Sequence, residues 1–294
     1  MSLPRGLAFP WAGLGEPAPK TLADARLQLH YTAQIVSSVG FTFVDPVPDF
    51  NHTNMGWDAA LGVLASWPAP GDRPFQAALR FRDLTLLLLG AEGRVAAEHS
   101  MDGRTIGDGY RWLQSAIETY TGKPIPKPLF RPDHELPPHA AGSSAPLTSQ
   151  PRGPFEELSR WYANADYVLR QWQSEYPAAS PVRCWPHHFD IAFLIHLDRE
   201  KGAEESRTIG VGLSPGDDSY QEPYFYISPY PYPEEETRRP ALAGAGHWNS
   251  EDFVAAVLPA SKLVDAGSPA AQLRQVEAYA RSAIEGCRKL LGAG

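Results

Sequence analysis

Residues 182–197 read VRCWPHHFDIAFLIHL, and the interpretation of the fold starts from this stretch. Its apolar residues recur with the period of two that a β-strand imposes, because successive side chains of a strand point to opposite faces. If the stretch is one strand, His187 and Phe189 begin the core face, which continues with apolar residues. His188 and Asp190 then begin the opposite face. The stretch therefore predicts a half-buried strand with two polar side chains on its open face.

Four segments around this strand have apolar residues at the i, i+3 and i+4 spacing of an amphipathic helix. Thr105 followed three residues later by Asp108 is a helix-start signal, and Gly40 and Gly122 are stop signals. The predicted helices cover residues 21–40, 106–121, 154–176 and 268–290.

Apolar alternation and turn residues predict antiparallel strands between these helices. In the first part of the chain they cover 59–66, 75–81, 85–89 and 95–99, and in the second 182–197, 208–213, 224–228 and 253–258. Each part then has the order helix, β-meander, helix. This order predicts an α+β protein of two similar halves, each an antiparallel β-meander flanked by helices.

The predicted halves cover residues 1–122 and 154–294, and a proline-rich linker covers 123–153. Such a linker is extended and has little secondary structure. The segment GWDAAL at 56–61 echoes HFDIAF at 188–193. An internal duplication would explain both the echo and the repeated order.

Composition restricts the class of protein. The chain of 294 residues has a formal net charge of −8, so a partner that requires a basic patch, such as nucleic acid, is not expected. The first residues lack the pattern of a secretion signal, and the most apolar stretch, 84–90, is too short to cross a bilayer.

Cys184 and Cys287 are expected to be reduced, buried thiols. Arginine outnumbers lysine and alanine is abundant. We therefore expect a soluble, cytoplasmic, bacterial protein with no membrane or nucleic-acid partner.

Four groups of residues carry a family resemblance across most of the chain: Leu22-Ala23-Asp24 with Leu29-His30 and Gln34-Ile35-Val36, then Gly71-Asp72-Arg73-Pro74-Phe75, Phe189-Asp190-Ile191-Ala192 and Glu222-Pro223-Tyr224-Phe225-Tyr226. In these motifs the sequence resembles an uncharacterised bacterial family, domain of unknown function 5996. The resemblance agrees with the architecture above and implies no activity.

His188 and Asp190 are the strongest candidates for chemistry, since residues two apart on one strand face lie about 6–7 Å from each other. With Glu222 from a following loop they would form a catalytic acid–base set. With Asp217 and Asp218 they would form a divalent metal site, for which zinc or iron is suitable. The structural alternative is that Asp190 accepts hydrogen bonds from a nearby turn.

The segment Gly212-Leu213-Ser214-Pro215-Gly216 matches the G-x-S-x-G pattern of a hydrolase nucleophile. In such enzymes the backbone N–H of the residue after the serine binds the oxyanion. Pro215 has no N–H, so this class of enzyme is not expected.

Aromatic residues near this strand indicate a ligand-binding cleft, because aromatic rings line most small-molecule sites. The candidates are Trp185, Tyr224, Tyr226, His247 and Trp248. Two functions remain open at this point. One is an enzyme that acts on a small molecule, with a divalent metal as candidate cofactor. The other is a non-catalytic protein that binds a small molecule or a partner in the cleft.

Overall fold

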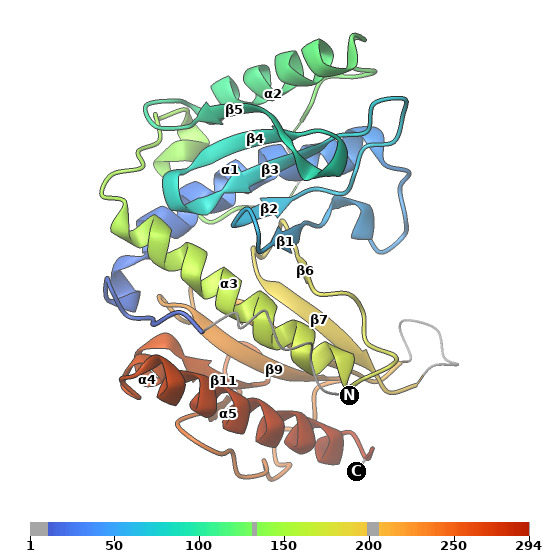
Figure 1. Cartoon of the computed structure of the whole chain (residues 1–294). Coiled ribbons are helices and arrows are strands. Elements are labelled where there is room, and N and C mark those ends of the chain that lie inside the picture. Colours follow the sequence, from blue (N-terminus) through green and yellow to red (C-terminus); the bar gives the residue numbers. More distant parts are fainter. Residues whose placement is uncertain (1–10, 131–133, 199–205, 294) are drawn as a thin grey trace.

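The computed structural model describes residues 11–130, 134–198 and 206–293, and it contains two antiparallel sheets (Figure 1). The first sheet has the order β1-β2-β3-β4-β5, and the second has the order β10-β11-β9-β8-β7-β6. The strands of the first sheet are β1 (Gly56–Asp58), β2 (Val63–Ala65), β3 (Gln76–Arg80), β4 (Thr85–Leu89) and β5 (Val95–Ser100). Those of the second are β6 (Arg183–Cys184), β7 (Ile191–His196), β8 (Thr208–Ser214), β9 (Tyr224–Tyr230), β10 (His247–Asn249) and β11 (Ala255–Pro259).

The four predicted helices are confirmed, and a short fifth helix is added. They are α1 (Ala23–Phe43), α2 (Ile106–Thr121), α3 (Gly153–Ser174), α4 (Ala260–Val264) and α5 (Pro269–Leu290). Thr105 and Asp108 form the expected capping box of α2, and Gly122 ends that helix with a φ of 70°. The α+β class with two similar halves is therefore confirmed: each half has an antiparallel sheet between helices.

Helix α1 continues past Gly40, where the sequence predicted its end. A Cβ atom at Gly40 would lie 2.1 Å from the backbone oxygen of His52 in the short 3-10 helix Asn51–Thr53. The glycine is thus required for close backbone packing and does not mark a helix end.

The two sheets adjoin at their edges. Met55 precedes β1, and its backbone N–H donates to the carbonyl of Cys184 in β6 at 2.9 Å, with the reverse bond at 2.8 Å. One hydrophobic core includes residues of both halves. Both Cys184 and Cys287 are free and buried, as expected. None of the helices in the described part of the chain has the length and hydropathy needed to cross a bilayer.

Helices α3 and α5 cover one face of the second sheet (Figure 1). The ring of Phe225 in β9 contacts Trp161 of α3, and the hydroxyl of Tyr279 in α5 donates to the carbonyl of Ala256 at 2.7 Å. On the opposite face Leu194 is 41% exposed, and a small separate cluster forms around Tyr224 and its neighbours. This second face is open, and the candidate site lies on it.

The prediction of one continuous strand over 182–197 is wrong. Strands β6 and β7 are joined by a tight turn in which the N–H of Phe189 donates to the carbonyl of Trp185 at 2.7 Å. The N–H of Trp185 donates to the carbonyl of Asp190 at 3.0 Å. Phe189 has a φ of 57°, in the left-handed region. His187 accordingly lies in the turn and is exposed, and does not belong to a core face.

The sequence echo between 56–61 and 188–193 does not occupy equivalent places. Trp57 lies within β1, and Asp58 accepts backbone hydrogen bonds from the turn that follows. Phe189 and Asp190 instead lie in the turn before β7. The similarity of the halves is one of element order.

Candidate functional site

Two hollows on the open face of the second sheet share His188, Asp190 and Tyr226. The first hollow has a volume of about 350 Å³ and the second about 420 Å³. The first is also lined by Ser214, Asp217, Tyr224, Tyr232 and Phe253, and the second by Asp49, Asn51, Trp185, His187 and His196. We call the two hollows together the groove.

The ring of Tyr226 crosses β8 and lies between the two hollows. Ala192 of β7, Gly212 of β8 and Tyr226 of β9 are paired across the sheet, so they occupy one row on the same face. A Cβ atom at Gly212 would lie 2.7 Å from the Tyr226 hydroxyl oxygen. Because Gly212 has no side chain, the Tyr226 ring lies over β8 and its hydroxyl donates to Oδ2 of Asp190.

Asp190 is the central group of the groove. It is 8% exposed, and its Oδ1 atom has no hydrogen-bond partner among the residues that the structure describes. Burial raises the pKa of Asp190, because removal from water disfavours the charged carboxylate. The hydrogen bond from Tyr226 and the proximity of His188 act in the opposite direction and are smaller. A carboxyl group in this state can hold a proton that an exposed aspartate would release.

The turn that carries Asp190 is held by α1 and α3. The Nε2 atoms of His30 and Gln34, one helical turn apart on α1, both donate to the carbonyl of Pro186 at 2.8 Å. The carbonyl acceptor requires that His30 carries its proton on Nε2. From α3, the hydroxyl of Tyr162 donates to the carbonyl of Phe189. These bonds fix the position of Asp190 without contacting the groove.

Acid is expected to destabilise the fold through His30. Burial lowers the pKa of His30 from 6.5 to about 4. Between pH 6.5 and pH 4 the unfolded chain therefore takes up a proton that the folded chain does not, at a cost of about 1.4 kcal/mol per pH unit. Denaturant unfolding of the wild type and His30→Gln over this range tests the effect. The wild type is expected to lose roughly 2–3 kcal/mol more than the variant, and equal losses would contradict the assignment.

Asp217 lies at the far wall of the first hollow and is held by its own loop. Its Oδ1 accepts from the N–H groups of Ser219 and Tyr220, both at 3.0 Å, and its Oδ2 accepts from the hydroxyl of Tyr224. Asp218 is exposed and does not line the groove. Of the candidate carboxylates in this loop, only Asp217 reaches the groove.

The structure does not assemble the predicted metal site. In the described ranges no three His, Cys, Asp or Glu side chains are arranged to hold a metal ion. His188, Asp190 and Asp217 line the first hollow, but Asp190 and Asp217 use carboxylate oxygens in hydrogen bonds to tyrosines. Both carboxylates are therefore engaged by hydroxyl groups of tyrosines that line the same hollow.

Glu222 lies away from the groove. It is 8% exposed, and its carboxylate accepts from the backbone N–H of Ser261 at 2.7 Å and from the Ser261 hydroxyl at 2.9 Å. The predicted convergence of Glu222 with His188 and Asp190 therefore does not occur. Glu222 attaches the β9 entry loop to the first turn of α4.

Replacement of Glu222 by alanine is expected to reduce stability and leave groove chemistry unchanged. The change leaves two donors of Ser261 without their acceptor, at a cost of about 1–3 kcal/mol in the free energy of unfolding. Glu235→Ala, at an exposed position, is the control and should change stability by less than about 0.5 kcal/mol. If a Glu222 variant keeps its stability but loses ligand affinity, Glu222 contributes to ligand binding and this assignment is wrong.

The predicted aromatic residues divide between the two faces of the second sheet. Trp185, Tyr224 and Tyr226 line the groove. His247 lies at its margin, where its Nε2 atom is 2.9 Å from the hydroxyl of Tyr220. Trp248 follows in β10 and points to the other face, where its ring approaches α5 and its Nε1 donates to the carbonyl of Pro240 at 2.7 Å. Trp248 is thus a packing residue.

Several groove residues were not predicted from the sequence, among them Ser214, Tyr232 and Phe253. The sequence pattern that could have indicated these residues is Gly210 and Gly212, two positions apart in β8. Together they leave one face of this strand without side chains, so that large side chains from neighbouring strands can lie across it.

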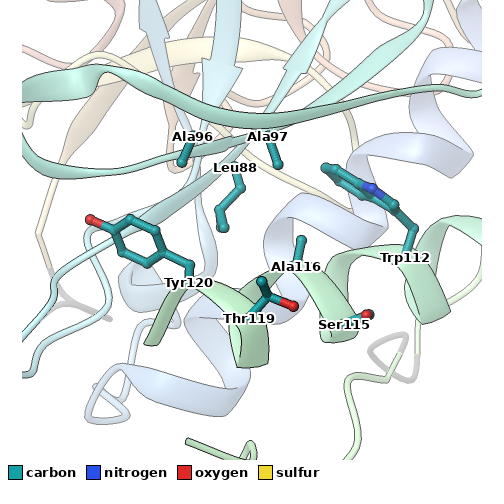
Figure 2. Close-up of a pocket in the computed structure, with 8 residues that line it drawn as sticks. All are labelled: Leu88, Ala96, Ala97, Trp112, Ser115, Ala116, Thr119 and Tyr120. Carbon is teal, nitrogen blue, oxygen red and sulfur yellow. The ribbon is translucent and has the colours of Figure 1, made fainter. Parts of the chain in front are cut away.

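A third hollow lies in the first half, between α2 and the strands β4 and β5 (Figure 2). Its volume is about 400 Å³. Small residues separate Trp112 from Tyr120, and both rings lie along the same side of α2 toward the strands. Its lining includes no carboxylate or histidine, so it offers less chemistry than the groove.

Comparison with known proteins identifies the family and no relative of known activity. No curated protein and no solved structure is significantly similar to the chain. One family model matches residues 18–286, which include both sheets, the groove and the residues of α1 and α3 that hold the Asp190 turn. The chain therefore belongs to DUF5996, a family of unknown function.

Proposed function

We propose that this chain is an enzyme that acts on a small molecule in the groove, with Asp190 as its proton-transfer group. The observation that carries the proposal is the state of the Asp190 carboxyl. It is almost fully buried, one oxygen has no partner in the described chain, and it lies where the two hollows meet. Buried titratable groups with shifted pKa values in a cleft are typical of catalytic sites.

The neighbours of Asp190 suit a proton donor. Burial raises the pKa of its carboxyl group, so the proton is retained closer to neutral pH. Burial also raises the pKa of the Tyr226 hydroxyl well above its usual value, so this hydroxyl stays protonated and remains a hydrogen-bond donor. After Asp190 gives its proton to a substrate, Tyr226 stabilises the resulting carboxylate. His188, which lines both hollows, is the candidate second group for proton transfer.

The setting that we propose is the cytoplasm of a bacterium. The two cysteines are free and buried, which suits a reducing compartment. The excess of arginine over lysine suits a GC-rich bacterial genome.

An untargeted turnover experiment tests the proposed enzyme. Purified protein is incubated with a bacterial metabolite extract, and mass spectrometry records which compounds are consumed and formed. The wild type should change at least one substrate–product pair, and Asp190→Asn should not. Asp72→Asn is the matched control, because Asp72 is exposed and pairs with Lys123 at 2.9 Å outside the groove. Equal turnover by wild type and Asp190→Asn would contradict the proposal.

The second candidate is a binding protein without catalysis. It is favoured by the fact that Asp217 already accepts structural hydrogen bonds and Glu222 lies away from the groove, so few reactive groups remain there. Compounds retained by the protein in the same extract, with none consumed, would support this candidate over the enzyme.

A further inference from the structure

We propose that the ligand of the groove carries a positively charged amine, and that its ammonium group binds in the first hollow between Asp190 and Asp217. This inference rests on the proposal that the groove is the ligand site. It concerns the charge of the ligand, which the proposed reaction leaves open.

The charge of the groove is the first argument. Asp190 and Asp217 line the first hollow, and Asp49 lines the second. Of the described residues that line either hollow, none is lysine or arginine. The described ion pairs include neither Asp190 nor Asp217. A phosphate or carboxylate group would therefore meet two acidic side chains and no lysine or arginine in the lining.

Three hydrogen-bond donors, two backbone N–H groups and the hydroxyl of Tyr224, point at the carboxylate of Asp217. The buried cation Arg26 of α1 interacts electrostatically with this loop but does not line the hollow. A Cβ atom at Gly216 would lie 2.6 Å from its Nη1 atom. Arg26 interacts with both Asp217 and Asp218, so a single guanidinium faces two carboxylates.

The buried carboxyl of Asp190 is the second, independent argument. A carboxyl group that is nine-tenths buried with one unpartnered oxygen is costly unless a ligand or a proton compensates it. An ammonium group supplies the missing charge and up to three N–H donors.

The remaining wall of the first hollow also suits a cation. Tyr224, Tyr226, Tyr232 and Phe253 surround the two carboxylates. The faces of aromatic rings attract cations, and together with a carboxylate they form the usual recognition site for amines. Serine hydroxyls of Ser214 and Ser228 add neutral acceptors.

The test is a ligand panel of matched triplets, in which an amine, an alcohol and a carboxylate share one carbon skeleton. Phenethylamine, 2-phenylethanol and phenylacetate form one triplet, and glucosamine, glucose and glucuronate another. Binding is measured by ligand-observed NMR and calorimetry. The amine of at least one triplet should bind about tenfold more tightly than its partners. Its affinity should fall by a similar factor in Asp190→Asn and in Asp217→Asn and remain unchanged in Asp72→Asn.

If no amine binds, or if an alcohol or carboxylate binds as tightly as its amine, the inference is overturned. Consumption of a neutral or anionic metabolite in the extract experiment would overturn the inference and leave the proposed enzyme standing. Amine binding without turnover would support the inference and contradict the proposed enzyme.

Discussion

Replacement of Asp190 by asparagine is expected to lower turnover by about 10²–10⁴-fold, the usual contribution of one acid–base group. The asparagine has nearly the same shape and fits beside Tyr226, but it carries no transferable proton. The free energy of unfolding should change little, because the amide oxygen still accepts from Tyr226 and the other polar atom is unpartnered in both proteins. Kinetics with the substrate found in the extract experiment, together with denaturant unfolding, measure both quantities.

Tyr226→Phe provides a graded comparison for this prediction. It removes the hydrogen bond to Asp190 Oδ2 and retains the ring that lies over Gly212. Its turnover should lie between those of the wild type and Asp190→Asn, with the alkaline limb of the pH profile moved to higher pH, since loss of the donor raises the pKa of Asp190 further. Full turnover by Asp190→Asn at unchanged substrate affinity would show that Asp190 does not transfer a proton in the reaction.

Replacement of Phe189 by alanine is expected to cost about 3–5 kcal/mol in the free energy of unfolding. The Phe189 ring is 1% exposed and stacks on His30 with ring centres 5.0 Å apart and an angle of 4°. It also contacts Phe81 and Tyr162 at 5.7 Å and 5.5 Å between ring centres. The ring thus joins α1, α3 and the first half of the chain to the turn that carries Asp190.

Phe50→Ala is the matched control, because Phe50 has the same φ of 57° and is 60% exposed. Alanine is as strained as phenylalanine at this φ, so the difference between the two variants reports the buried ring alone. The control should change stability by less than about 1 kcal/mol. Similar losses in the two variants would contradict the packing role of Phe189.

The helices and most strands could be predicted because their signals are local. The Thr105–Asp108 capping box lies within four consecutive residues, and the alternation that defines β7 lies within six. Thr85–Leu89 was predicted with its observed bounds. Strand β10 was missed because three residues are too few for a period of two to be recognised.

The turn at 185–190 was misread for a physical reason. Its side chains continue the alternation of β7, but Phe189 has a left-handed backbone that bulky residues rarely adopt. The turn is stabilised by bonds from α1 and α3, more than a hundred residues away for His30 and Gln34. Tertiary contacts of this kind override the local pattern.

The candidate site could be predicted in part. The predicted residues that line the groove are Trp185, His188, Asp190, Asp217, Tyr224 and Tyr226. Tyr224 and Tyr226 lie in β9, while the others come from the turn before β7 and the loop after β8. The pairing of Asp190 with Tyr226 depends on Gly212 and on the strand register, which the sequence does not specify. Glu222 binds the backbone N–H and hydroxyl of Ser261 at the start of α4, and the local sequence does not distinguish such a buried carboxylate from one that faces a ligand.

The most direct test of this account is a titration of the Asp190 carboxyl group by carbon-13 NMR, assigned with Asp190→Asn. In the free protein its pKa should lie above the usual value of 3.8. A pKa at or below 3.8 in the free protein would contradict the central claim, because Asp190 would then be an ordinary ionised carboxylate with no proton to transfer.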